Sequence, residues 1–599
     1  MTRKQPNIVL VLTDDQGYGD LGCTGNPFVQ SPNVDAFYAQ SVRLTDYHVG
    51  PTCAPTRAGL LTGHYANSTG VWHTIGGRSL LREDEWTLAA ALAEAGYATG
   101  IFGKWHLGDA WPYRPQDRGF GSAVVHGGGG ISQTPDFWGN DYFDDTYFVN
   151  GEPGAFEGYC TDVWFDLAQR FILDNRDRPF FCYIPTNAPH SPYNVEKRYA
   201  DLYRQKEPES RARFHGMITN IDENFARLRA YLGQLGLEEN TILIFMTDNG
   251  TSGGAAVDER GHVVHGYNAG MRGLKGSPYD GGHRVPFFIR YPAGGIGGGK
   301  DVRCITANVD FMPTMLDLCG VEAPEDRTFD GRSLVPLLRA ASAGNPPPAD
   351  WPDRVLVTDS QRLTNPVMWR QSATMTNRWR LVNGTELYDI KIDPGQVRDV
   401  AGEHPEVIGR LRAEYERWWE KVSKQFDRAI PLAIGADGWN GSTLTAHDLR
   451  NEECDVPWNQ GHIRAGHLSR GHWEFRVDAP GTYAFELRRW PEELGYALSA
   501  GIAEPDIEWR RDLIDREDWS LYEGGAALSI SAARLRVGDR EAEQEIDPET
   551  GASASAARFT LDLPAGKTRL EASFTVNGGE VSAYYVSVNR AEPPDEGVP

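Results

Sequence analysis

Positive charge is scarce in this 599-residue chain, which has 59 Lys and Arg residues against 83 Asp and Glu and a net charge of −24. Nucleic-acid binding depends on cationic contacts with phosphates, so the composition argues against a nucleic-acid partner. The same deficit disfavours long-range attraction of a polyanion, and an anionic substrate must be held by local positive charge. Because 40% of the residues are hydrophobic, the chain can form a large core and more than one domain.

Long apolar segments and paired cysteines are also lacking. No run approaches the roughly 18 apolar residues of a membrane helix, and the first residues contain no apolar leader. We therefore expect a cytoplasmic protein with no membrane partner, or a periplasmic or secreted one if a leader has been removed. The seven cysteines are scattered, which predicts neither a disulfide framework nor a zinc module.

Two apolar runs end in oxygen-bearing side chains. Residues 7–13 and 241–247 have the pattern of strands buried on both faces of a parallel sheet. The residues that follow these runs are Asp14 and Asp15 in the first case and Asp248 and Asn249 in the second. Ligands bind at the carboxyl ends of strands in open α/β sheets, and such hard oxygen ligands suit Ca²⁺ or Mg²⁺. Adjacent carboxylates at one strand end also occur in ordinary turns.

A cysteine lies where a loop is predicted to enter a helix. The stretch from Gly50 to Gly63 reads GPTCAPTRAGLLTG, with Pro55 suited to a first helical turn and Cys53 just ahead of the helix. Free backbone N–H groups and the helix dipole favour negative charge there. Arg57, one turn further on, can direct a planar cation to the same point. Alone, Cys53 would be interpreted as a small buried residue.

Further basic side chains follow predicted strands or turns. Lys104 and His106 are two residues apart, which would place them on the same side of an extended segment. His190 follows another predicted strand, and Lys275 lies in the turn Gly273-Leu274-Lys275-Gly276. Each of these residues also has an ordinary interpretation, as a solvated lysine or a packed histidine. The glycine- and aromatic-rich segment 119–158 is expected to form a long loop over the site.

Together these motifs resemble those of the type I sulfatases. The similar segments are CxPxR followed by AGLLTG at Cys53, DDQGYGD at Asp14, GKWHLG at Lys104, Pro-His-x-Pro at His190, and the turn at Lys275. They occur in the family's order over about residues 5–425. The resemblance implies an α/β fold of the alkaline phosphatase superfamily, in which helices flank a large, mixed and mostly parallel sheet.

Three parts of the chain are predicted. Residues 1–325 would form the catalytic α/β domain and residues 326–428 a small antiparallel α+β subdomain, as the resemblance implies. Residues 429–599 show alternating strand patterns separated by turns, which predict an appended β-rich, sandwich-like domain. Its role stays open between carbohydrate contact, oligomerisation into a homo-oligomer, covering of the active-site rim, and packing alone, which we take as the default.

The resemblance also implies a catalytic chemistry. In this family the motif cysteine is oxidised after translation to formylglycine, whose hydrated aldehyde is the nucleophile, so a formylglycine-generating enzyme would be a partner of Cys53 during maturation. One divalent cation per chain is implied, Ca²⁺ with Mg²⁺ or Mn²⁺ as alternatives. The ligands that the resemblance implies are Asp14, Asp15, Asp248, Asn249 and residue 53.

The remaining roles are likewise implied by the resemblance. Arg57 would support the hydrated residue 53, and Lys104 and Lys275 would neutralise the charge of the sulfate. His106 would take a proton from the second hydroxyl of residue 53. His190, with Lys275, would protonate the leaving oxygen. The substrate would be a sulfate monoester of an aryl or carbohydrate alcohol.

Two alternatives were weighed against a sulfatase. A phosphonate monoester or phosphodiester hydrolase of the same superfamily also uses formylglycine, but such enzymes carry histidine where this chain has Asn249 and lack the Asp14–Asp15 pair. A non-catalytic binder of sulfated glycans, with an unmodified cysteine, would not need the complete set of site residues. We therefore expect a sulfatase.

Overall fold

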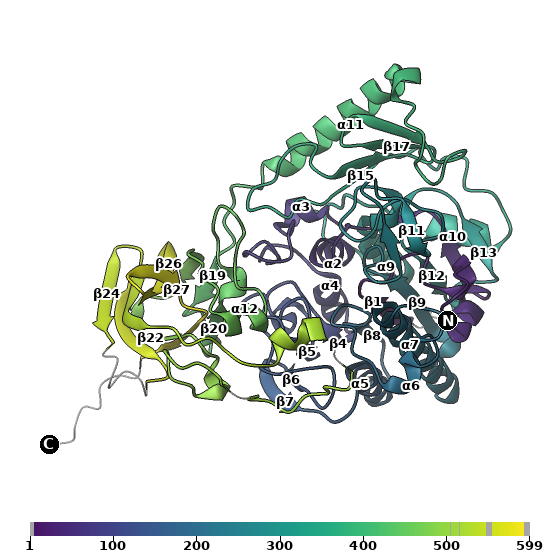
Figure 1. Ribbon diagram of the computed structural model, residues 1–599. Helices are drawn as coiled ribbons and strands as arrows, with labels where there is room; N and C mark the ends of the chain where they lie inside the picture. Colours follow the sequence, from purple (N-terminus) through teal and green to yellow (C-terminus); the bar gives the residue numbers. More distant parts are fainter. Residues whose placement is uncertain (1–4, 504, 514–515, 547–553, 592–599) are drawn as a thin grey trace.

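A computed structural model describes residues 5–503, 505–513, 516–546 and 554–591. Its centre is a large mixed sheet (Figure 1). In spatial order the strands are β13 (Lys300–Val302), β2 (Val42–Leu44), β12 (Phe287–Arg290), β9 (Thr241–Thr247), β1 (Asn7–Thr13), β8 (Phe180–Pro185), β4 (Ala98–Lys104), β5 (Ser122–His126), β6 (Thr146–Val149) and β7 (Glu152–Ala155). The middle of the sheet, from β9 to β5, is parallel, and β12, β6 and β7 are antiparallel to their neighbours. The predicted fold class is confirmed.

Helices cover both faces of this sheet because its strands present apolar side chains on both faces. Ile8, Leu10 and Leu12 of β1 belong to one buried cluster, and Val9 and Val11 to another. The helices that contribute to the first cluster are α2 (Cys53–Thr62), α4 (Leu88–Glu94), α9 (Phe311–Cys319) and α10 (Val335–Ser342). Those that contribute to the second are α1 (Pro32–Tyr38), α5 (Cys160–Asp174) and α7 (Glu209–Gln234). Burial of both faces of β1 explains its uninterrupted apolar sequence.

The segment 119–158 is more regular than the sequence indicated. Instead of one long loop, it contains β5, β6 and β7, which extend the edge of the central sheet. The residues between β5 and β6 do form a loop, and Gly127 to Gly130 lie at its start.

The structure describes all seven cysteines, and all are free, in agreement with the expectation that there is no disulfide framework.

A small subdomain follows the central sheet in the chain. Its antiparallel strands are β15 (Leu356–Asp359), β16 (Ser372–Met375), β17 (Trp379–Val382) and β18 (Glu386–Asp389), and helix α11 (Pro405–Ser423) packs beside them. In Figure 1 this subdomain stands above the α/β part.

None of the helices in the described part of the chain has the length and apolarity needed to cross a membrane.

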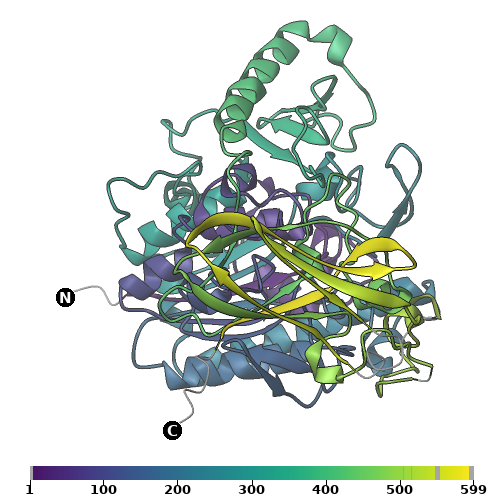
Figure 2. The ribbon, with the colours of Figure 1, turned by 90° about the vertical axis from the view of Figure 1, so that its left-hand side faces the viewer.

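The remaining described residues form two further sheets. One contains β19 (Leu432–Ile434), β21 (Trp473–Val477), β26 (Gly566–Val576), β23 (Ile530–Val537), β24 (Arg540–Glu545) and β27 (Gly579–Ser582). The other contains β20 (Ser442–Thr445), β28 (Tyr585–Arg590), β22 (Gly481–Arg488) and β25 (Ala557–Leu563). Both sheets contribute to a single hydrophobic cluster, as in a sandwich. Figure 2 shows this β-rich part lying across the α/β part. The domain boundaries given above stay predictions.

A buried arginine ties the subdomain to the central sheet. Arg380 of β17 has no exposed side-chain surface and lies 2.7 Å from Asp46 and 2.9 Å from Asp280, which begins the short helix α8 (Asp280–His283). Burial favours the neutral form of Asp46, but Arg380 holds the pKa of this carboxyl below its ordinary value. One guanidinium group therefore balances two buried carboxylates from a different part of the chain.

We predict that Arg380→Met destabilises the protein by about 3–5 kcal/mol, because it leaves the buried Asp280 without its cation and Asp46 with only the more distant Arg284, 4.0 Å away. The matched control is Arg378→Met, since Arg378 is 57% exposed and its guanidinium, which pairs with Asp389, stays in contact with solvent. A pair with a solvated partner contributes about 0–1 kcal/mol. Chemical unfolding of both variants measures the difference. Equal losses in the two variants would contradict the role given to Arg380.

Candidate active site

Two neighbouring strands deliver the acidic side chains to one point. β1 and β9 pair in parallel, with Thr13 opposite Thr247, so the residues after them are side by side. The amide of Asp15 donates to Asp248 Oδ1 at 3.1 Å, and Asn249 Nδ2 donates to Asp15 Oδ1 at 2.9 Å. Asp15 has a φ of 64°, a strained conformation of the kind found at functional sites. The two strands are thus neighbours in the sheet, and their carboxyl ends bring the four oxygen-bearing residues together.

Cys53 is the first residue of α2, with Thr52 as the N-cap, so its predicted position just ahead of the helix was wrong by one residue. The helix is buried along its length and ends at Gly63 in the left-handed conformation, which glycine adopts without strain. Ligand atoms of Asp14, Cys53 and Asp248 all lie within 4.8 Å of one another. The structure thus brings residue 53 to the carboxylates.

Each buried carboxylate is matched by a cation from another element. Lys104 Nζ, at the end of β4, lies 2.6 Å from Asp14 Oδ2. Arg57, on α2, lies 2.8 Å from Asp248 Oδ2. Lys275 Nζ lies 2.6 and 2.8 Å from the two oxygens of Asp15. Because hydrogen-bonded pairs offset the cost of burying charge, these contacts allow three carboxylates to share one site.

The pairing does not neutralise the carboxylates equally. Burial raises the pKa of Asp15, but the nearby Lys275, His190 and Lys104 together hold it below its ordinary value. Burial and the neighbouring Asp14 raise the pKa of Asp248 to about 7, although Arg57 and Lys104 oppose this. Burial and the neighbouring Asp14 therefore disfavour the ionised form of Asp248, which lies beside residue 53.

The site has the donors for a divalent cation. Among the described residues no hydrogen-bond donor reaches the buried oxygens Asp14 Oδ1 and Asn249 Oδ1, and such unpaired acceptors cost free energy. Together with Asp15 and Asp248 they give three carboxylates and one amide oxygen, which is a donor set suited to Ca²⁺ or Mg²⁺. A cation held by these four residues would satisfy both unpaired oxygens and would favour the ionised form of Asp248.

His106 is held with one ring nitrogen free. It has a φ of 62°, so the expectation of an extended segment shared with Lys104 was wrong. Its Nε2 donates to the Thr74 carbonyl at 2.9 Å, while the buried Nδ1 has no partner in the described structure. Burial, and then Lys104, lower the pKa of His106 well below its ordinary value. His106 is therefore neutral, and Nδ1 can accept a proton.

His190 lies beside Asp15 of the acidic cluster. Its Nδ1 donates to the Ser191 carbonyl at 2.6 Å, and its Nε2 lies 3.7 Å from Asp15 Oδ2. Burial, and then the charge of Lys275, lower the pKa of His190 to about 3. The His190 side chain is 15% exposed and that of Lys275 is 17% exposed, whereas Arg57 and Lys104 are fully buried. Solvent and substrate therefore reach the site from the side of His190 and Lys275.

Sequence reasoning missed a further arginine at this entrance. Gly276, next to Lys275, donates its amide to the Pro51 carbonyl at 2.8 Å, and a Cβ at Gly276 would lie 3.8 Å from the guanidinium carbon of Arg362. Arg362 is exposed and has a φ of 45°. It comes from the loop after β15, where no motif indicated a function, so only the folded chain reveals it.

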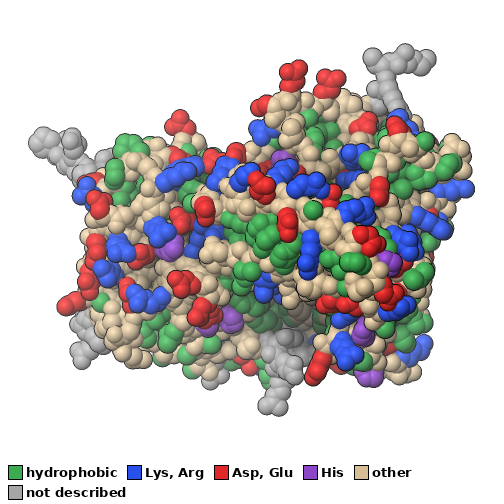
Figure 3. All heavy atoms as spheres, turned by 90° about the horizontal axis from the view of Figure 1, so that it is seen from above, with side chains coloured by type: hydrophobic (Ala, Val, Ile, Leu, Met, Phe, Trp, Pro, Cys, Tyr) green, Lys and Arg blue, Asp and Glu red, His purple; other side chains and the backbone are tan. Residues whose placement is uncertain are grey.

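Positive charge is local, as the composition predicted. On the face shown in Figure 3, Lys and Arg side chains are interspersed with Asp and Glu, with no broad field of one sign.

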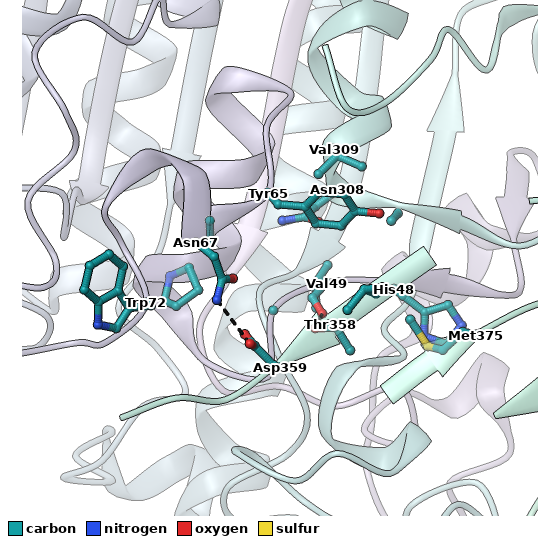
Figure 4. A pocket seen from close by; sticks show the side chains of 15 residues that line it. His48, Val49, Tyr65, Asn67, Trp72, Asn308, Val309, Thr358, Asp359 and Met375 are labelled. Carbon is teal, nitrogen blue, oxygen red and sulfur yellow. Dashed lines mark hydrogen bonds between the residues drawn. The ribbon is translucent and has the colours of Figure 1, made fainter. Parts of the chain in front are cut away.

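Figure 4 shows a cavity beside α2, where the side chain of Asn67 bonds to Asp359 at 3.1 Å. With a volume of about 30 Å³ it can hold about one water molecule. It is too small for a substrate, and no residue of the acidic cluster lines it.

The chain matches a family model described as Sulfatase over residues 6–321, and one described as N-sulphoglucosamine sulphohydrolase, C-terminal, over residues 275–421. It is 28% identical to the N-acetylgalactosamine-6-sulfatase of Mus musculus over 430 residues, which cover 67% of this chain and 79% of the relative. It is 30% identical to arylsulfatase A of Homo sapiens over 468 residues, which cover 68% and 87% of the two chains. The solved structure of Ps i-CgsB in complex with k-i-k-neocarrahexaose aligns with a TM-score of 0.62 at 25% identity, covering 71% of this chain and 94% of that one.

We predict that Asp248→Asn weakens Ca²⁺ binding by at least about tenfold, the lower bound seen even for outer-shell partners of a metal. The amide keeps an oxygen for Arg57 but removes one negative charge from the cluster. Asp20→Asn is the matched control, because Asp20 is equally buried and bonds the amide of Gly17 at 2.8 Å instead of joining the cluster. Titration calorimetry of purified protein measures both affinities. Wild-type affinity in Asp248→Asn would contradict a cation at this strand edge.

Proposed function

This chain belongs to the sulfatase family and is a sulfuric ester hydrolase, and from that premise we propose how its own residues carry out the reaction. We propose that Cys53 is converted to formylglycine by a formylglycine-generating enzyme. The modified residue would then hydrolyse sulfate monoesters of aryl or sugar alcohols with the help of one divalent cation, Ca²⁺ in the first instance. The observation that carries the proposal is the meeting of residue 53 with Asp14 and Asp248 inside 4.8 Å.

The donor set supports an oxygen at residue 53. A thiolate is a soft ligand, whereas the carboxylates and amide around it are hard donors that select Ca²⁺ or Mg²⁺. Replacing the sulfur with oxygen would make residue 53 consistent with Asp14, Asp15, Asp248 and Asn249. When bound, the cation supplies a Lewis acid that polarises a sulfate oxygen.

The cationic side chains would bind and orient the ester. Lys104 and Arg57 are fully buried, so they provide fixed positive charge, and preorganised charge of this kind stabilises a transition state without reorganisation. Lys275 lies at the entrance and would contact the incoming sulfate. In this arrangement the ester's alcohol points toward the open side, where His190 and Lys275 lie.

The two histidines would move different protons of the reaction. His190 Nε2 lies 3.7 Å from Asp15 Oδ2. An anionic ester bound beside Lys275 would offset the charge of this lysine and raise the pKa of His190, so that it can protonate the leaving oxygen. The free Nδ1 of His106 would accept a proton from a hydroxyl of residue 53 after the alcohol has left. Fixing the His106 proton on Nε2 through the Thr74 carbonyl leaves Nδ1 as the basic atom.

Residue 249 favours sulfate over phosphorus esters. The Asn249 amide oxygen is a neutral, hard ligand and leaves the cation strongly electrophilic, whereas an imidazole at this position would suit transition metals better. The cations Arg57, Lys104 and Lys275 can match a singly charged sulfate ester without a further group.

We therefore predict that kcat/KM for an aryl sulfate exceeds that for an aryl phosphonate and an aryl phosphodiester with the same leaving group by about tenfold or more, which corresponds to about 1.4 kcal/mol of transition-state binding. All three rates are measured on one preparation of known formylglycine content. Cys53→Ala serves as the control and should lose multiple turnover while keeping its unfolding transition. A higher kcat/KM for either phosphorus ester would assign the chain to the rival activity instead.

A further inference from the structure

The orientation of His106 depends on a short loop outside the catalytic motifs. The carbonyl of Thr74 receives the Nε2 proton of His106, and this contact decides which ring nitrogen is basic. The loop from Trp72 to Arg78 is compact, because His73 and Arg78 bond to the backbone within it. Contacts that hold this loop in place therefore also keep the proton of His106 on Nε2 and leave Nδ1 as the basic atom.

The β-rich part of the chain fixes this loop. The amide of Gly76 donates to the His447 carbonyl at 2.8 Å, and Arg450 donates to the Gly77 carbonyl at 3.4 Å. The side chain of Ile75 packs against the hydrophobic cluster of the two β-rich sheets. The two matched family models end at residues 321 and 421, so the contacting segment 446–450 lies beyond both.

His447 also lies beside His106 itself. It is buried, its ring centroid is 6.3 Å from that of His106, and its Nδ1 lies 3.2 Å from Asp448 Oδ1. Such a carboxylate orients an imidazole ring. The oriented ring of His447 thus packs against one side of the His106 ring.

The β-rich part also holds a second loop, the one after β5, against His106. A Cβ at Gly129 would lie 2.2 Å from the His106 ring, so the loop after β5 packs directly on this side chain. Downstream in that loop, the Thr134 amide donates to the Trp458 carbonyl, and the Gln460 amide donates to the Ser132 carbonyl, both at 3.0 Å. His106 is therefore enclosed by two loops that the β-rich part anchors.

From these contacts we infer that the β-rich part contributes to the active site by positioning a catalytic side chain. Its segment 446–450 holds the loop 74–77, and this loop positions His106. This inference rests on the role proposed above for His106. Leu80, Tyr113 and Trp138 share the hydrophobic cluster of the β-rich sheets, so the two parts have a common core. His447 and Asp448 are positioning residues, since they act through His106 and the loop.

The test uses the full chain with Gly77→Ala. Gly77 has a φ of 62°, and a Cβ there would lie 2.9 Å from the Asp448 carbonyl oxygen, so the loop must move away from the β-rich part. The matched control is Gly236→Ala, which has a φ of 67° and no described atom within 4 Å of the added Cβ. Both variants carry the strain of a left-handed alanine, but only the first disturbs the contact.

We expect Gly77→Ala to lower kcat for an aryl sulfate by about 10- to 100-fold, since small misplacements of a catalytic group have effects of this size. KM should stay the same or fall, because His106 acts after the alcohol has left. Gly236→Ala should keep the wild-type kcat. His447→Ala should also lower kcat, and His447→Gln, which keeps a planar hydrogen-bonding side chain, should restore most of it. Unfolding midpoints are recorded for every variant.

The outcomes separate this inference from the proposed function. Wild-type kcat in a folded Gly77→Ala variant would overturn the inference alone. Equal losses of kcat in Gly77→Ala and Gly236→Ala, or a loss in His447→Ala that His447→Gln leaves unchanged, would assign the segment a purely structural role and overturn it as well. If the wild-type protein with formylglycine at residue 53 releases no sulfate, the proposed function fails and the role of His106 fails with it.

Discussion

Three carboxylates buried at the ends of two adjacent strands are the constraint on which the site depends. Asp14, Asp15 and Asp248 repel one another, and isolated buried charges of this kind are not stable. The structure balances them with Lys104 from β4, Arg57 from α2 and Lys275 from the turn after residue 273. The central sheet, α2 and the Lys275 turn must therefore assemble together, and residue 53 enters the cluster with α2.

The parts of this site that sequence reasoning predicted correctly are those governed by local patterns. The apolar runs before Asp14 and Asp248 fix two central strands, and their parallel pairing follows from burial on both faces. The loop-to-helix pattern placed Cys53 to within one residue. Local patterns failed where the backbone conformation is decided by distant contacts, as at His106, whose positive φ is maintained by Thr74 and Gly129.

Sequence reasoning could not predict the contacts between distant segments, because such contacts leave no pattern in the local sequence. Arg362 and His447 are ordinary residues in their own stretches, and they gain a role because the chain returns to the site from the subdomain and from the β-rich part. Arg380 shows the same principle in stability, since its two carboxylate partners precede it by at least 100 residues. The chain after residue 321 thus supports the site, although most motifs lie before it.

The central claim, that residue 53 acts as formylglycine among hard oxygen ligands, is tested most directly by mass spectrometry of the peptide that contains residue 53. The peptide is isolated from protein that is releasing sulfate from a sulfate ester, so that chemistry and modification are measured on one sample. The account predicts an aldehyde at residue 53 in place of the heavier thiol, in a fraction that rises in proportion to the specific activity. Full activity in protein whose residue 53 is entirely unmodified cysteine would contradict the account.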